Sequence, residues 1–264
     1  MARRHAMQAV QAARSWTPYC GAAPSPELWL GRWNFDPLLC GVLLLLAVVL
    51  WRPLRNPQPT ARRQRNALRG AWLLTVLLYV SPLCALSSAF FTVRVVHHMA
   101  LVLLLAPLLA FGLAPWLRRF PTPLWTCTAL AAIAFIAWHI PAPYEAAMAS
   151  VAVYWLMQFT LLGSALAFWV AVLRVEPAGA LAAILATTVL MGLLGALITF
   201  AARPLYAPHF ASTSSWGVSP LEDQQLAGIV MWAPGSIAYL LAAVWIGWRW
   251  LRIERERRLR VELV

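Results

Sequence analysis

The chain has 264 residues, of which 62% are hydrophobic and only 11% are charged. A soluble domain of this size carries roughly a quarter charged residues, so the composition excludes an ordinary soluble protein and predicts a chain embedded in a lipid bilayer. The net charge is +12, and all 21 residues in the Lys+Arg count are arginine. These arginines lie mostly between apolar runs, where they orient a membrane protein, so we expect no nucleic-acid binding.

Apolar segments follow one another along the whole chain. Each approaches the length of about 20 residues that a helix needs to cross a hydrocarbon core of about 30 Å. We expect about seven spans, at residues 35–51, 67–86, 95–116, 124–140, 151–172, 179–201 and 225–248. Pro82 and Pro107 are expected to kink the second and third spans. The predicted fold is an all-α polytopic membrane helix bundle.

The same pattern divides the chain into three parts. Residues 1–34 are predicted to form an N-terminal tail, 35–250 the transmembrane domain and 251–264 a basic C-terminal tail. The loop after the first span and the segment after the last span each hold six arginines. Cytoplasmic loops are enriched in arginine, so we expect the N-terminus outside and the C-terminus in the cytoplasm. Only the arginines of the N-terminal tail oppose this orientation.

Ionisable side chains inside lipid are costly, and those that remain are candidates for function. In the expected orientation they gather at the outer ends of the spans. Neutral imidazole is the commonest metal ligand in proteins, and together with sulfur ligands it suits copper. The candidate metal ligands are therefore His97, His98, His139, Cys84 and Asp223.

Simpler roles compete with metal binding for several of these residues. A histidine at a helix end often only hydrogen-bonds a backbone carbonyl. Asp223, at the start of the seventh span, suits an N-terminal cap of that helix. His209, in a loop beside Pro208, is expected at the ordinary surface.

The chain contains four cysteines, and their spacing is uninformative. They are Cys20, Cys40, Cys84 and Cys127, and none forms a CxxC pair. The spacing alone therefore favours neither a structural zinc site nor a disulfide framework. Cys40 and Cys127 are expected to act as small apolar residues.

Residues 219–232, SPLEDQQLAGIVMW, resemble the CtaG family of caa3-type cytochrome c oxidase assembly factors. Further segments fit that family in the same order: DPLL (36–39), VSPL (80–83), HHMALVLLLAPLL (97–109), WHIPAPYEAAM (138–148) and MGLLGALITFAARPLY (191–206). The resemblance covers nearly the whole chain from about Trp33. It implies a multi-pass protein of the bacterial inner membrane that takes part in maturing the copper centres of a haem-copper oxidase. Copper would be its metal, and the oxidase core subunit and a periplasmic copper donor its partners.

The family pattern implies which residues form the site. His98 and His139 match histidine positions on the third and fourth spans, whereas Arg94 and Gln158 stand where the pattern has histidine. Cys84 stands where the family pattern has an acidic residue. These departures fit a copper site rebuilt from the remaining histidines and Cys84, and equally a branch that assists assembly without holding copper.

Other functions make different demands on the sequence. A transporter for copper or another small solute needs polar groups through the midplane, where the spans show little besides Ser164, Thr187 and Thr188. A serine protease needs a base beside its nucleophile, and no GxSxG motif is present. A retinal protein needs a lysine, and the chain has none. A non-enzymatic assembly factor, a metallochaperone, is the preferred interpretation, with a transporter as the alternative.

Overall fold

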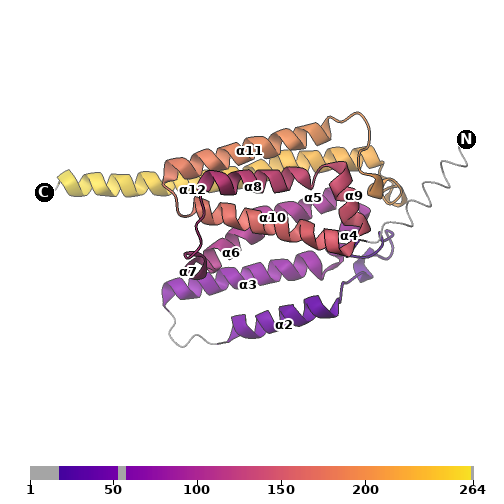
Figure 1. Ribbon diagram of the computed structural model, residues 1–264, viewed down its shortest axis with the longest axis horizontal. Coiled ribbons are helices and arrows are strands. Elements are labelled where there is room, and N and C mark those ends of the chain that lie inside the picture. Colours follow the sequence, from indigo (N-terminus) through magenta and orange to yellow (C-terminus); the bar gives the residue numbers. More distant parts are fainter. Residues whose placement is uncertain (1–17, 53–57, 263–264) are drawn as a thin grey trace, which may run out of the picture.

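The computed structural model describes residues 18–52 and 58–262, and these residues form a bundle of helices without any strand (Figure 1). The α-helices are α2 (Pro37–Trp51), α3 (Pro59–Tyr79), α4 (Pro82–Ala89), α5 (Phe91–Ala100), α6 (Ala106–Gly112), α7 (Ala114–Leu117), α8 (Leu124–Ala137), α9 (Pro141–Ala149), α10 (Val151–Val172), α11 (Pro177–Thr199) and α12 (Pro220–Glu262). A π-helical turn, η2 (Leu101–Leu105), joins α5 to α6, and three short 3-10 helices are η1 (Trp29–Gly31), η3 (Ala207–His209) and η4 (Ser214–Trp216). The all-helical prediction is confirmed.

Four helical segments are long and apolar enough to cross a membrane: Phe91–Gly112, Val151–Val172, Pro177–Thr199 and Pro220–Glu256. Two bent pairs also qualify if each pair counts as one span, which raises the number to six. The bend is 49° between α3 and α4 and 73° between α8 and α9. The first predicted span is α2, which has only 15 residues and is shorter than the usual spanning length. The structure therefore supports four to six spans, and the count of seven and the orientation stay predictions.

The long helices run lengthwise, so the bundle has two distinct ends (Figure 1). At one end, on the right in Figure 1, α3, α8 and α11 terminate, and the short helices α4 and α9 lie there with the loops. We call this the histidine end, because it contains Arg94, His97, His98, His139 and His209. At the opposite end, α12 projects beyond the bundle (Figure 1). Its 43 residues span about 64 Å at 1.5 Å per residue, roughly twice the hydrocarbon thickness. Arg3, Arg4 and Arg14 of the predicted tail lie outside the described residues.

The π-helical turn η2 and Pro107 together leave one backbone carbonyl of this segment without a helical hydrogen bond. Within this turn the Ala106 N–H bonds the Leu101 carbonyl, and Pro107 has no N–H to donate. The carbonyl of Val102 is consequently left without a helical donor. The indole Nε1 of Trp169 on α10 donates to it at 2.8 Å. Freed backbone groups in a membrane helix need such a partner from a neighbouring helix, so this bond fixes α10 against the segment that follows His98.

Two glycines allow α11 and α12 to approach closely at the histidine end. A Cβ added at Gly195 would lie 2.8 Å from the backbone oxygen of Gly228. A Cβ added at Gly228 would lie 2.5 Å from the Gly195 oxygen and 2.7 Å from the Thr199 nitrogen. Because lipid provides no hydrophobic force between helices, close contact of small residues is a main source of attraction.

We expect Gly228→Ala to separate α11 from α12, because the obstacle to the new methyl group is backbone, which cannot rotate away. Overpacking of this kind costs about 1–3 kcal/mol. Thermal unfolding of the detergent-solubilised protein, followed by tryptophan fluorescence, should show a lower midpoint. The matched control is Gly163→Ala on α10, where an added Cβ meets nothing within 4 Å. Equal midpoints for the two variants would contradict this account.

Candidate functional site

Three histidines form one buried cluster at the histidine end. His97 and His98 lie on α5, and His139 lies between α8 and α9. The ring centroids of His98 and His139 are 5.4 Å apart, and those of His97 and His98 are 6.3 Å apart. All three side chains are at most 3% exposed. Imidazoles from separate segments therefore meet inside the bundle and do not point toward lipid.

The hydrogen bond of His139 fixes which of its nitrogens is free. Its Nδ1 lies 2.6 Å from the carbonyl oxygen of Phe135. A carbonyl only accepts, so Nδ1 carries the proton and Nε2 keeps its lone pair. That Nε2 is buried and has no partner among the described residues. Metal-binding histidines commonly donate one ring N–H to a carbonyl in this way, which orients the other nitrogen toward the ion. The Tyr206 hydroxyl donates to the His139 carbonyl at 2.8 Å and steadies the same turn.

The other two histidines leave all of their nitrogens without protein partners. Neither Nδ1 nor Nε2 of His97 or His98 makes a hydrogen bond to any described residue, and all four atoms are buried. Buried polar atoms are normally paired, and an unpaired one needs an explanation. A metal ion held between His98 and His139 would pair two of the orphaned nitrogens. In the described part of the chain no group of three or more His, Cys, Asp or Glu side chains is placed to hold one ion. The protein therefore supplies two imidazoles to such a site.

Arg94 places a fixed positive charge beside these histidines. It is fully buried, one helical turn before His98 on α5, and residues four apart share a helix face. Its Nη1 donates to the Tyr154 hydroxyl at 3.3 Å, and its Nη2 lies 3.8 Å from the sulfur of Met148. The guanidinium also lies 5.2 Å from the Tyr154 ring centroid. The ion pairs found among the described residues join Arg252 to Glu256 and Arg258 to Glu254, so Arg94 stays charged without a carboxylate partner there.

Gln158 connects to the cluster through Tyr79. The Tyr79 hydroxyl donates to the Gln158 Oε1 at 2.9 Å, and the Tyr79 ring meets the His97 ring edge-on at 4.9 Å. The Nε2 of Gln158 is buried without a partner among the described residues. Gln158 is thus part of the same polar layer, although its amide oxygen is already engaged.

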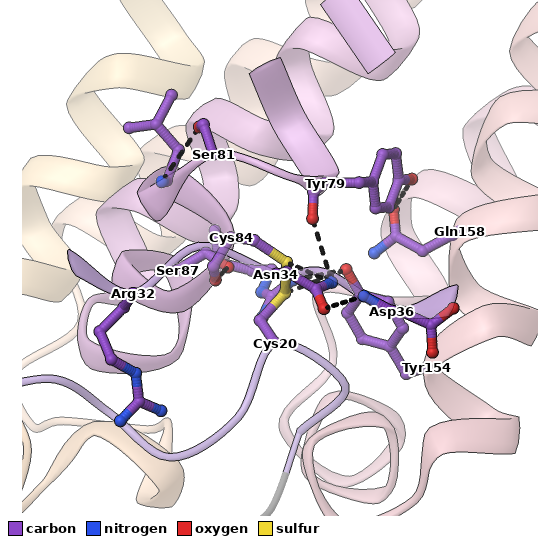
Figure 2. Close-up of a disulfide and its surroundings, with 12 residues drawn as sticks. Cys20, Arg32, Asn34, Asp36, Tyr79, Ser81, Cys84, Ser87, Tyr154 and Gln158 are labelled. Atoms are coloured by element: carbon purple, nitrogen blue, oxygen red, sulfur yellow. Dashed lines mark hydrogen bonds between the residues drawn. A yellow bond between two sulfur atoms is a disulfide. The ribbon is translucent and has the colours of Figure 1, made fainter. Parts of the chain in front are cut away.

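Cys84 is joined to Cys20 by a disulfide, with the two sulfurs 2.03 Å apart (Figure 2). A metal binds the thiolate form of cysteine, so the oxidised Cys84 offers no such ligand. The spacing of the cysteines gave no reason to expect this bond, because the partners are 64 residues apart. The two cysteines meet because the segment before α2 folds back against the start of α4. Asn34 holds this segment there: its backbone N–H donates to the Val80 carbonyl at 2.9 Å, and its side-chain amide donates to the Tyr79 carbonyl at 3.1 Å.

Asp223 caps a different helix from the one expected. Its Oδ2 accepts from the Phe91 N–H at 2.7 Å and its Oδ1 from the Thr92 N–H at 3.1 Å. It therefore caps α5, whereas the expected helix, α12, is capped by a reciprocal pair. The Ser219 N–H donates to Glu222 Oε2 at 2.8 Å, and the Glu222 N–H donates to the Ser219 hydroxyl at 3.2 Å, as in a capping box. Both carboxylate oxygens of Asp223 are engaged in holding the helix that carries the histidines.

His209 is buried, so the expectation of an ordinary surface residue is wrong. Its side chain is 2% exposed, and its Nε2 lies 2.6 Å from the Tyr144 hydroxyl. Burial lowers the pKa of His209 to about 3, so the ring is neutral. Tyr144 and Tyr206 were not singled out in the sequence, and the one signal for them is that both lie in segments that resemble the family.

We expect Asp223→Ala to loosen the start of α5, because two backbone N–H groups lose their acceptor. Loss of a capping carboxylate costs about 0.5–2 kcal/mol, to be measured as a lower midpoint of thermal unfolding. Glu145→Ala is the control, since Glu145 lies on α9 at the same end and makes no hydrogen bond to any described residue. If both variants unfold at the wild-type temperature, the carboxylate does not support α5.

Comparison with known proteins gives one match. The family model described as cytochrome c oxidase caa3 assembly factor (Caa3_CtaG) matches residues 43–253, which include α5, η2, α8 and the start of α12. No curated protein and no solved structure matches the chain. The matched range includes His97, His98, His139 and Asp223, so the histidine cluster lies within the part of the chain that the family model matches. The chain belongs to the family of cytochrome c oxidase caa3 assembly factors.

Proposed function

We propose that this protein matures the copper centre of a haem-copper oxidase in the bacterial inner membrane by holding one Cu(I) ion between His98 and His139. The observation that carries the proposal is the imidazole pair with ring centroids 5.4 Å apart and unpartnered buried nitrogens. The protein acts as a metallochaperone without turnover. It takes the ion from a periplasmic copper donor and passes it to the oxidase core subunit in the same membrane.

Arg94 favours a monovalent ion at this site. Electrostatic repulsion from a fixed positive charge is twice as large for a divalent ion as for a monovalent one. Imidazole suits copper, and the two-histidine arrangement supplies no anionic ligand to offset a double charge. The same charge weakens the hold on Cu(I) as well, which suits a protein that must release its ion.

The disulfide supports the proposed orientation. Disulfides persist in oxidising compartments such as the bacterial periplasm and are rare in the cytosol. Cys20 and Cys84 both lie at the histidine end, and the arginine-rich segments 58–69 and 249–260 lie at the opposite end of α3 and α12. We therefore propose that the histidines lie near the periplasmic face, on the side from which a periplasmic donor would deliver copper.

We expect the purified protein to bind one Cu(I) per chain, and the double variant His98→Ala/His139→Ala to bind none. Competition with a chromogenic Cu(I) chelator measures the stoichiometry and affinity in detergent. The control is Cys127→Ala, which removes a free buried thiol at the other end of α8 and should leave binding unchanged. Full Cu(I) binding by the double variant would reject these two residues as ligands.

In cells that depend on the caa3-type oxidase, we expect the same double variant to leave the oxidase without its copper. Oxidase activity should fall several-fold while the variant protein is inserted at the wild-type level, as checked by immunoblotting of membranes. Copper uptake by vesicles that contain the wild-type protein would instead favour the transporter. An oxidase with full copper content in the variant strain would show that the histidine pair is not needed for assembly.

A further inference from the structure

The buried charge of Arg94 is linked to a cysteine sulfur through the hydroxyl of Tyr154. Arg94 Nη1 donates to the oxygen of the Tyr154 hydroxyl at 3.3 Å, and that hydroxyl lies 3.6 Å from the Cys20 sulfur. The Tyr154 oxygen accepts from the guanidinium, so its own proton is free to point at the sulfur. A disulfide sulfur is neutral and a weak acceptor. In the oxidised protein, the hydrogen-bond chain from Arg94 through Tyr154 to Cys20, which we call the relay, therefore ends on a sulfur that cannot neutralise the charge of Arg94.

From this relay we infer that Cys20–Cys84 is a redox-active disulfide that accepts two electrons from a protein dithiol. Reduction would convert Cys20 into a thiolate, the anion that the described surroundings of Arg94 lack. A disulfide whose reduced form is stabilised is a strong oxidant, and thiolates are stabilised beside arginine. Figure 2 shows the two sulfurs between the segment before α2 and the start of α4, with the Asn34 amide 4.0 Å from the Cys84 sulfur and the Tyr154 hydroxyl 3.6 Å from the Cys20 sulfur. The inference does not depend on copper binding.

The exchange proceeds in two balanced steps. A partner thiolate attacks the sulfur of Cys20, because the residue Cys20 is 7% exposed and the residue Cys84 is 0% exposed, and the S–S bond breaks. Cys84 leaves as a thiolate, with the Asn34 amide 4.0 Å away as donor, and takes up a proton. The second thiol of the partner, after losing its proton to solvent, then attacks the partner's first sulfur, which is bonded to Cys20 in the mixed disulfide. Cys20 leaves as a thiolate held by Tyr154 and, through it, by Arg94. The partner dithiol is oxidised to a disulfide, and the protein disulfide is reduced by two electrons.

A cavity lies beside the segment that carries Cys20, and contacts other than the disulfide hold that segment in place. Pro18 and Ala22, which flank Cys20, line a cavity of about 310 Å³ that Met148 and Ser88 also line. The segment around Cys20 stays anchored without the disulfide, because Tyr19 stacks on Tyr154 at 5.4 Å and Trp216 Nε1 donates to the Pro24 carbonyl at 3.1 Å. These contacts keep the two sulfurs near each other after reduction, so the bond can form again.

The test measures the equilibrium between the disulfide and dithiol forms in the full chain. The background carries Cys40→Ala and Cys127→Ala, which leaves only the two paired cysteines. The detergent-solubilised protein is equilibrated at pH 7 with buffers of reduced and oxidised glutathione, quenched with acid, and its thiols are counted by a maleimide gel shift. We expect the folded protein to be reduced reversibly, and Arg94→Gln to lower the equilibrium constant for reduction about tenfold, which corresponds to about 30 mV.

Two further variants separate charge from structure. Arg94→Lys keeps the positive charge and should recover most of the wild-type equilibrium constant. Arg203→Gln removes an exposed arginine from the loop after α11 and should change nothing. The inference is overturned if Arg94→Gln, folded as judged by its unfolding midpoint, keeps the wild-type equilibrium, or if the disulfide is reduced only after the protein unfolds. Because no step uses copper, these results stand apart from the Cu(I) titration.

Discussion

The absence of water inside a bilayer governs this structure more than any single contact, because a polar group left unpaired in hydrocarbon costs several kcal/mol. The fold meets this demand with partners from neighbouring helices. The carboxylate of Asp223 on α12 holds the first N–H groups of α5, and Trp169 on α10 holds the carbonyl that Pro107 leaves free. Each of these bonds joins the histidine-bearing segment to a different helix. The histidine-bearing segment is therefore held in place by two neighbouring helices.

Against that careful pairing, the unpaired nitrogens of the histidine cluster are exceptional. Together with one nitrogen each of Arg94 and Gln158 they make up seven of the ten buried side-chain atoms that lack a partner among the described residues, and the other three belong to Tyr19, Ser88 and His209. A structure that pairs its backbone so thoroughly has no need to bury three imidazoles without partners for stability alone. The proposed metal handling rests on this concentration of unpaired buried nitrogens, and family membership connects the protein to cytochrome c oxidase assembly.

Much of the fold follows from the sequence. The predicted span at 151–172 coincides with α10, and 179–201 lies within two residues of α11 at each end, because long apolar runs between arginines leave little choice. The bent pairs were harder. Pro82 was expected to kink the second span, and a 49° bend lies there between α3 and α4. Pro141 was expected to close the fourth span, yet it starts a further helix, α9, because proline suits the first turn. Residues 141–149 were therefore expected to lie outside a helix.

The site was predictable only in part, since its decisive features depend on how distant segments meet. The convergence of His98 and His139 was anticipated from their matching depths. The partner of Cys84 and the helix capped by Asp223 were not, because both depend on packing between residues far apart in the chain. His209 gave no signal at all, because its burial comes from Tyr144 and the surrounding loop and not from any local pattern.

The bond between Cys20 and Cys84 also bears on biogenesis. The helices α2 and α3 lie between the two residues in the chain, so the sulfurs meet only after this hairpin has been threaded and folded back. A molecule inserted upside down would carry both thiols into the reducing cytosol and leave them unlinked. In the proposed orientation with seven spans, formation of the bond would record that α2 and α3 entered the membrane in the working direction, and a cell could distinguish correctly inserted copies by this covalent mark.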